Sequence, residues 1–98
     1  MTLLHDPEFG VADWRRLLHS IGEDPSRQGL IDTPNRVIRA WAHWTRGYQQ
    51  DPATILKTFS DGGENYDELI IVKQIPVYSH CEHHLAPFFG HATIGYLP

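Results

Sequence analysis

Only two segments of this chain have the pattern of a β-strand, and both lie in its second half. Residues 69–78 form an apolar, β-rich run that Pro76 interrupts, and residues 91–97 form a second run behind Gly90. Proline inside a strand indicates an edge strand or a bulge. Two strands make a poor sheet, because an isolated hairpin is only marginally stable in water. We therefore expect this sheet to need further strands, from a continuation of the chain or from partner chains.

Helical patterns occupy the first half of the chain. Apolar residues within 11–21 recur at the spacing of one helical face, and Gly22 is expected to end that helix. A second helix should begin with Thr33 as its N-cap and Pro34 in its first turn. Gly47 is expected to close this second helix, because glycine is the residue most common just past a helix end.

The order of these elements predicts an α+β fold. Residues 51–59 are expected to add a short helix and residues 61–65 a turn before the strands begin. Helices followed by strands are typical of the α+β class. We expect a single domain over residues 1–98, with a helical N-terminal region at 1–60 and the start of a sheet at 61–98.

Composition and charge exclude several classes of protein. Hydrophobic residues make up 41% and charged residues 20%, which is ordinary for a globular protein and excludes a disordered acidic tail. The net charge of −4 argues against a nucleic-acid-binding protein. The single cysteine excludes an internal disulfide framework and favours a reducing compartment. With no apolar run of about 18 residues and no secretory N-terminus, we expect a cytoplasmic protein with no membrane partner.

Two arginines form a candidate anion site. Arg36 and Arg39 lie three residues apart, so they share one face near the start of the expected second helix. That end of a helix is positive, so two arginines are unfavourable there unless an anion joins them. One interpretation is an anion site built from helix N–H groups and two guanidinium groups. The other, which spacing alone favours, is two solvated arginines with a local ion pair to Asp32.

The segment between the two strands holds a candidate metal site. Cys81 and His84 are separated by two residues, a spacing that lets one turn place a thiolate and an imidazole on one metal ion. Cysteine with histidine favours zinc over magnesium or calcium. The alternative is a polar turn with a buried cysteine. A catalytic zinc usually has three protein ligands, so a third would come from His80, His83 or His91, from another chain, or from residues beyond this sequence.

Glu82 and His83, which lie between the two candidate ligands, are also candidates for functional roles. If Cys81 and His84 face the metal, His83 need not, and its ring is suited to general acid–base chemistry near neutral pH. The alternative for His83 is a solvent-exposed turn histidine. Glu82 would be able to orient an imidazole as a hydrogen-bond partner. An exposed carboxylate is the commoner case, and we favour it for Glu82.

Three runs of the chain resemble the GTP cyclohydrolase I family. The most specific is residues 75–98, in which a Cys-Glu-His-His-Leu block at 81–85 is followed by Pro-Phe-Phe-Gly at 87–90. Residues 22–37 and 66–73 resemble the helical N-terminal region and the following segment of the same family. The resemblance covers nearly the whole chain from about Trp14 onward.

The resemblance implies an enzyme. Members of this family are hydrolases that convert GTP and water to formate and 7,8-dihydroneopterin triphosphate, the first step toward tetrahydrofolate and other pterins. Zinc activates the water that attacks C8 of the guanine ring. By position, Cys81 and His84 match two of the three zinc ligands, and His83 matches the catalytic histidine that handles protons. Arg36 matches a position near the triphosphate, and Arg39 matches another that varies and is often lysine.

The resemblance also implies a fold and an assembly. The family has the tunnelling fold (T-fold) and forms toroidal homodecamers whose active sites lie between subunits. We therefore expect residues 61–98 to be the first antiparallel strands of a T-fold, incomplete at its C-terminus. The family continues beyond this Gly-Tyr-Leu-Pro end with a Ser-Lys segment, two long helices and a His-x-Cys that carries the last zinc ligand. We expect the N-terminal part of such an enzyme, inactive by itself.

Two residues depart from the family pattern, and two other functions stay open. His80 stands where the family usually has an apolar or small residue, and His91 stands where lysine is common. Each is either an additional zinc-binding imidazole or a harmless substitution, and we favour the second. The main alternative function is a truncated, non-catalytic module that binds zinc or docks onto other subunits. A related tunnelling-fold enzyme acting on pterins or deazapurines fits the Cys-Glu-His-His-Leu block less well.

Overall fold

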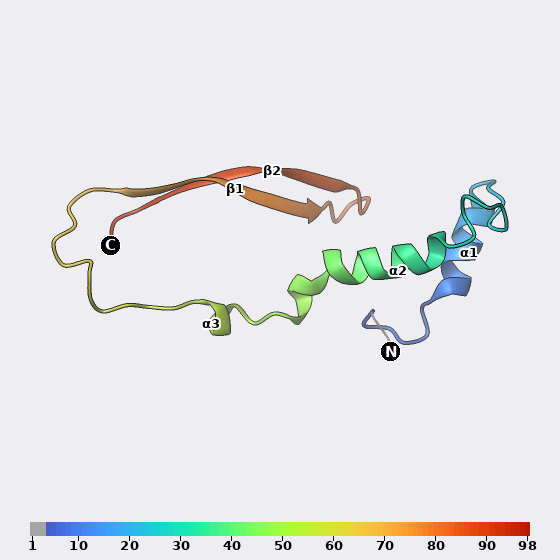
Figure 1. Ribbon diagram of the computed structural model, residues 1–98, viewed down its shortest axis with the longest axis horizontal. Helices are drawn as coiled ribbons and strands as arrows, with labels where there is room; N and C mark the ends of the chain where they lie inside the picture. Colours follow the sequence, from blue (N-terminus) through green and yellow to red (C-terminus); the bar gives the residue numbers. More distant parts are fainter. Residues whose placement is uncertain (1–3) are drawn as a thin grey trace. The chain divides into compact units, whose positions relative to one another are not determined.

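The computed structural model describes residues 4–98 and confirms the α+β fold (Figure 1). The chain divides after Gln50 into two compact units, here called the helical unit and the sheet unit. Whether they form the single domain predicted, with its regions 1–60 and 61–98, stays a prediction. The elements of the described residues are α1 (Val11–Ser20), α2 (Thr33–Trp44), the 3-10 helix η1 (Arg46–Gln49), α3 (Pro52–Ile55), β1 (Ile70–His80) and β2 (Pro87–Tyr96).

Gly22 terminates α1 as predicted, because the backbone there turns left-handed. Its φ is 94°, a conformation that glycine adopts without steric cost. The N–H of Gly22 donates to the carbonyl of His19 at 3.0 Å, and the N–H of Glu23 donates to that of Leu18 at 3.0 Å. This pair of bonds is a Schellman motif, which satisfies two carbonyls that the helix end would otherwise leave open.

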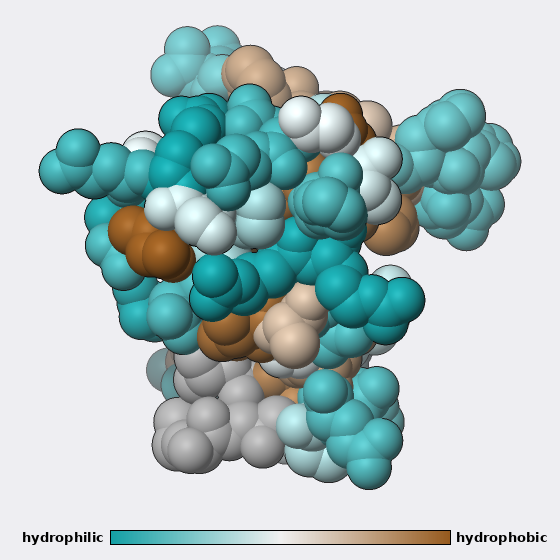
Figure 2. All heavy atoms as spheres, turned by 90° about the vertical axis from the view of Figure 1, so that its right-hand side faces the viewer, coloured by the Kyte–Doolittle hydropathy of each residue, from teal (hydrophilic) through white to brown (hydrophobic). Residues whose placement is uncertain are grey.

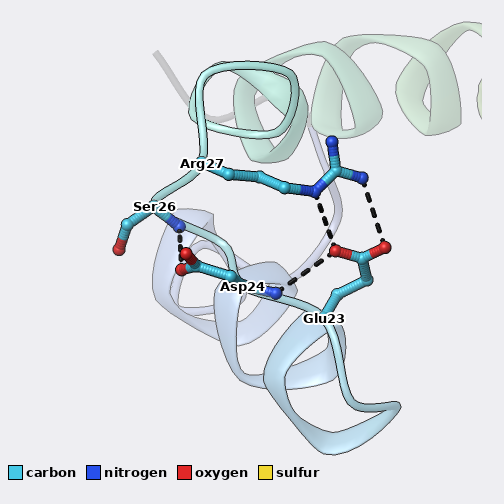
Figure 3. A network of polar contacts seen from close by, with 4 residues as sticks. All are labelled: Glu23, Asp24, Ser26 and Arg27. Carbon is cyan, nitrogen blue, oxygen red and sulfur yellow. Dashed lines mark hydrogen bonds and ion pairs between the residues drawn. The ribbon is translucent and has the colours of Figure 1, made fainter.

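A compact loop with its own polar network follows α1 (Figure 3). Both carboxylate oxygens of Glu23 accept from the Arg27 guanidinium, at 2.9 and 3.2 Å. Glu23 also accepts from the N–H of Asp24 at 3.2 Å, and Asp24 accepts from the N–H of Ser26 at 2.9 Å. The bonds from Arg27 and from the Asp24 backbone lower the pKa of Glu23. The same Glu23 carboxylate raises the pKa of Arg27.

The boundaries of α2 differ from the prediction by a few residues. Asp32 occupies the N-cap position that was expected for Thr33, which is instead the first helical residue. The helix ends at Trp44, before the predicted stop at Gly47. Both the N–H and the hydroxyl of Thr45 donate to the carbonyl of Trp41, at 2.9 and 2.7 Å. The chain then tightens into η1, which contains Gly47; such 3-10 turns are common at helix ends.

Aromatic side chains join α1 to α2. The ring of Trp14 stacks on that of Trp41 with centroids 6.2 Å apart and planes inclined by 28°. Phe9 meets Trp14 edge-on at 5.7 Å, and Trp44 meets Trp41 at 5.8 Å. Such pairs stabilise a packed contact beyond the area they bury. The face drawn in Figure 2 is mostly hydrophilic, and hydrophobic residues show there as separate patches.

The sheet unit begins with a helix shorter than predicted. Asp51 caps α3, since its carboxylate accepts from the N–H of Ala53 at 3.0 Å. The helix nevertheless ends at Ile55, and the prediction of helix as far as Phe59 is wrong. All residues of 51–59 are exposed, so no tertiary contact repays the cost of extending a helix of one turn.

The sheet is a single antiparallel hairpin of β1 and β2, longer than the sequence indicated. Pairing runs from Ile70 opposite Tyr96 to His80 opposite Pro87. The predicted end of the first strand at residue 78 and the predicted start of the second at residue 91 are therefore wrong. Cross-strand bonds carry the ladder up to the turn at Cys81, and they form between residues that no local pattern connects.

A β-bulge interrupts the hairpin between Val72 and Ile75. Val72 lies opposite Ile94 and Ile75 opposite Ala92, so β1 has one residue more than β2 across this interval. Gln74 sits within it at a φ of 55°. The bulge that Pro76 led us to expect is thus present, two residues before the proline. Each strand also has one paired neighbour in residues 4–98, so both are edge strands.

One face of the hairpin is largely apolar, with Ser79 as its polar member. Residues opposite each other across a ladder share a face, and the register assembles eight apolar residues on one side. No side chain of this face is fully buried, and most of the face is about half exposed. The need for further strands or covering elements stays a prediction that this exposure supports. The apolar face consists of Ile70, Val72, Ile75, Val77, Phe88, Ala92, Ile94 and Tyr96.

Candidate active-site turn

A tight turn between the strands carries the predicted site residues. The N–H of Leu85 donates to the carbonyl of Cys81 at 2.7 Å, which closes one helical turn. The N–H of Cys81 donates to the carbonyl of Ala86 at 2.8 Å, which joins that turn to the hairpin ladder. Leu85 ends the helical turn with a left-handed φ of 55°. Both backbone polar groups of Cys81 are therefore held, and its side chain has a fixed starting point.

The structure brings Cys81 and His83 together at this turn. Cys81 is a half-buried free thiol, and its Sγ lies 3.8 Å from Nδ1 of His83. The rings of His83 and His84 have centroids 6.4 Å apart with planes inclined by 72°. Both histidines are exposed, and so is Glu82, as we favoured for that carboxylate. Cys81, His83 and His84 thus lie side by side on one turn with their side chains accessible from solvent.

The donors at this turn suit zinc in type but not in number. A thiolate and an imidazole are the ligands that zinc prefers. Residues 4–98 hold no group of three histidine, cysteine or acidic side chains placed to share a metal ion. His80 pairs with Pro87 at the end of β1, and His91 lies opposite Pro76, so neither completes a cluster with Cys81. The zinc site, and with it the roles of Cys81 and His84, stays a prediction.

The two arginines of the candidate anion site lie on α2. Arg36 Nη2 is 3.8 Å from the Asp32 carboxylate, so the local ion pair that we considered is present. The two side chains are 66% and 69% exposed, and an exposed pair at that distance contributes little to stability. Arg39 is exposed on the same helix. Nothing in this geometry tests phosphate binding, which stays a prediction for both arginines.

Two backbone features escaped the sequence interpretation. The left-handed Leu85 has no signal of its own, because glycine or asparagine is the usual residue there. The position of the bulge at residues 73–74 left no clear signal either, because residues 69–72 are a continuous apolar run with no alternation to slip. Pro76 indicated an edge strand or a bulge without locating the extra residue.

These observations define a class: a small α+β chain whose hairpin turn presents a thiol and two imidazoles. The sequence profile of the family "GTP cyclohydrolase I" matches residues 11–98. The chain therefore belongs to the GTP cyclohydrolase I family. The match includes α1, α2, the hairpin and the whole Cys-Glu-His-His-Leu block.

Relatives named GTP cyclohydrolase 1 support the same conclusion. The protein of Nitrosospira multiformis is 82% identical over 94 residues, which cover 96% of this chain and 49% of the relative. That of a Janthinobacterium species is 68% identical over 91 residues, covering 93% and 46%. That of Corynebacterium glutamicum is 53% identical over 94 residues, covering 95% and 46%. The chain spans about half the length of the curated relatives it matches.

Family membership assigns the strands to the T-fold predicted for residues 61–98. The helices followed by an antiparallel hairpin agree with that assignment. A separate observation concerns membranes: no helix within residues 4–98 has the length and apolar character needed to cross one.

Proposed function

We propose that this chain contributes to a GTP cyclohydrolase I, which hydrolyses GTP to formate and 7,8-dihydroneopterin triphosphate on the route to tetrahydrofolate and other pterins. The observation that carries the proposal is the family match across residues 11–98, which includes the turn with Cys81, His83 and His84. Relatives at up to 82% identity are named GTP cyclohydrolase 1, which supports the same activity.

Cys81 and His84 would hold the zinc ion of this enzyme. Both lie on a turn whose hydrogen bonds to Leu85 and Ala86 fix the backbone of Cys81. A fixed backbone limits the orientations open to the thiol, which favours a defined ligand geometry. Zinc, when bound, would supply Lewis-acid activation of water near neutral pH. Two ligands from this turn leave at least one to come from elsewhere in the enzyme.

His83 would transfer protons during opening of the guanine ring. Its Nδ1 faces the sulfur of Cys81 at 3.8 Å, which leaves Nε2 as the ring nitrogen directed to other partners. The imidazole is exposed, and histidine is the side chain that most often serves as a general acid or base. The contact with Cys81 would also hold the ring in one orientation relative to the metal ligands.

Arg36 and Arg39 would bind the triphosphate of GTP. Phosphate oxygens accept two parallel hydrogen bonds from a guanidinium group, and the start of a helix attracts anions. The existing partner of Arg36, the Asp32 carboxylate at 3.8 Å, is largely exposed. An exposed ion pair is weak, so a phosphate would displace it at little cost in free energy.

The same proposal includes a cytoplasmic homo-oligomer of the family type. Both strands are edge strands, and the apolar face of the hairpin is about half exposed. Edges and faces of this kind favour pairing with further strands and covering elements. The main alternative, a non-catalytic zinc-binding or docking module, is supported by the lack of a three-donor cluster in residues 4–98.

A chimera tests the activity directly. The 94 matched residues of this chain would replace the corresponding segment of the Nitrosospira multiformis relative, to which they are 82% identical. We expect the chimera to release formate from GTP and to retain zinc. Cys81→Ser should lower the zinc content, measured by mass spectrometry of the purified protein. His83→Ala should lower kcat by roughly 10² to 10⁴ with zinc content unchanged, since that is the usual contribution of a general acid or base.

His91→Ala is the matched control, because it removes an exposed imidazole that lies in β2, outside the turn block at 81–85. Its kcat should stay within about twofold of the parent chimera. A folded chimera that retains zinc but releases no formate would contradict the enzymatic proposal and favour the module. Equal losses in His83→Ala and His91→Ala would contradict the role given to His83.

A further inference from the structure

The β-bulge of β1 has a backbone that its sequence does not favour. Gln74 adopts a φ of 55°, which the side chain of a non-glycine residue makes costly. The regular pairs that flank the bulge are Val72 with Ile94 and Ile75 with Ala92, which leaves Thr93 as the one residue of β2 facing it. This conformation costs free energy at one place in an otherwise regular ladder, so another property of the hairpin should compensate for it.

Neither strand pairing nor the apolar face requires the extra residue. Without Gln74, Lys73 would lie opposite Thr93 while Val72 kept its partner Ile94 and Ile75 kept its partner Ala92. Each apolar residue of the hairpin would keep the face that it now occupies, because the pairing register on both sides of the bulge is unchanged. The left-handed residue would be gone and the ladder would be continuous. What the extra residue does change is the bend and twist of β1, which a bulge increases locally.

The bulge and the turn lie at opposite ends of a long stretch of β1. The six residues of β1 from Ile75 to His80 lie between the bulge and the turn. At about 3.3 Å per residue they span roughly 20 Å. A change of about 3° at the bulge therefore moves the turn by roughly 1 Å relative to residues 70–72 and 94–96. A misplacement of about 1 Å is enough to cost an enzyme on the order of 10²-fold in rate.

We infer that the extra residue at Gln74 is a positioning element for the turn that carries Cys81, His83 and His84. The bulge bends β1 so that the turn reaches the position its chemistry needs. The strained conformation of Gln74 is the free-energy cost of that bend. This inference rests on the proposed function, because position matters only if the turn acts on a substrate. The backbone of residue 74 does the positioning, and no role is assigned to its side chain.

The test uses the chimera described above in four versions: the parent, a deletion of Gln74, Gln74→Gly and Gln74→Val. The deletion should leave the melting temperature equal or higher and lower kcat at least tenfold. Its KM for GTP should stay within about twofold, because the arginines proposed to bind phosphate lie on α2. Gln74→Gly keeps the extra residue and suits a positive φ, so its kcat should equal that of the parent. Gln74→Val keeps the extra residue but opposes the positive φ. Its kcat should therefore fall between that of the parent and that of the deletion variant.

The outcomes separate this inference from the proposed function. An inactive parent chimera contradicts the proposed function. An active parent together with a folded deletion variant of parental kcat overturns the positioning inference alone. If the deletion variant does not fold, the comparison of Gln74→Gly with Gln74→Val tests the positioning inference instead. At matched melting temperatures, a kcat for Gln74→Val several-fold below that of Gln74→Gly supports the inference, and equal values overturn it.

Discussion

The helical unit and the sheet unit differ in where their side chains find partners. In the helical unit, Trp14 stacks on Trp41 across two helices, and the loop after α1 is held by a network of four polar residues. In the sheet unit, the two strands pair with each other but leave an apolar face about half exposed. Ile94 on that face is 52% exposed.

The difference shows which unit depends on contacts beyond its own residues. The helical unit draws on contacts between neighbours in sequence and between two adjacent helices. The sheet unit satisfies its backbone along one ladder, while its apolar side chains gain little from burial. The turn with Cys81 and His83 is carried by the sheet unit. The residues proposed to carry the chemistry therefore lie on the unit whose own packing supports them least.

The largest effect that follows is on stability in the helical unit. Trp14→Ala removes the ring that both Phe9 and Trp41 contact, and we expect it to lower the free energy of unfolding by about 3 kcal/mol. Ile94→Ala removes a half-exposed side chain from the open face and should cost less than about 1 kcal/mol. Urea denaturation followed by circular dichroism at 222 nm, together with hydrogen exchange in the hairpin, measures both.

Tyr48→Ala is the control for loss of an aromatic ring, because Tyr48 is 94% exposed. It should change the free energy of unfolding by no more than about 0.5 kcal/mol. If Ile94→Ala proved as costly as Trp14→Ala in the isolated 98-residue chain, the apolar face would be covered in solution. The comparison between the two units would then fail.

A smaller effect comes from two left-handed residues, one in each unit. Gly22 ends α1 at a φ of 94°, and Leu85 ends the site turn at 55°. Gly22→Ala should destabilise the helical unit by about 1 kcal/mol, although a Cβ there would meet no atom within 4 Å. Leu85→Gly should stabilise the turn by up to about 1 kcal/mol, because it removes the same steric cost.

Amide hydrogen exchange reports both changes at their own sites. The Leu85→Gly variant should show slower exchange at the N–H of Cys81, which bonds to Ala86 across the turn. Leu85→Val, which is β-branched, should exchange faster than the parent chain at the same amide. Faster exchange in the glycine variant would mean that the exposed leucine side chain stabilises the turn by more than its conformation costs.

The smallest effect is the pH dependence of the loop after α1. The Arg27 guanidinium and the Asp24 N–H hold the pKa of Glu23 below its ordinary value of 4.5. A carboxyl whose pKa is lower in the folded state stabilises the fold above its unfolded pKa, and that stabilisation is lost as pH falls through the folded pKa. NMR titration of the Glu23 carboxyl should therefore give a midpoint below 4.5.

Arg27→Gln tests the cause of that shift. It removes the two guanidinium bonds and should raise the Glu23 midpoint toward its ordinary value, with the Asp24 contact left in place. Arg16→Gln, a change of an exposed arginine on α1, is the matched control and should leave the midpoint unchanged. An identical midpoint in the parent and in Arg27→Gln would show that the backbone bond dominates.

Local signals predicted the elements well and their ends less well. Gly22 ended its helix as expected, because a positive φ is a property of one residue and its neighbours. Gly47 did not end α2, since the hydroxyl of Thr45 satisfied a carbonyl earlier. The strands extended past residue 78 and began before residue 91 because cross-strand bonds near Cys81 added pairs. Local patterns do not report such bonds.

At the site, too, local patterns predicted some features and the tertiary structure decided others. Residue types and spacing indicated a turn with Cys81, His83 and His84, and the family resemblance gave those residues roles. The contact between the thiol of Cys81 and the imidazole of His83, at 3.8 Å, was decided by the turn geometry. The ion pair of Arg36 with Asp32 was foreseen from spacing because it lies within one helical turn.

By itself, the sequence determined the class of fold, the helical and β-rich halves and the family, and it predicted the residues proposed to carry the chemistry. These depend on residue identity and on periodicities of two and 3.6 residues, which short stretches of chain express. Only the tertiary structure decided the length of the hairpin, the conformations of Gln74 and Leu85, and the contact of Cys81 with His83. Each of these depends on backbone groups brought together by strand pairing, whose free energy is shared among residues distant in sequence.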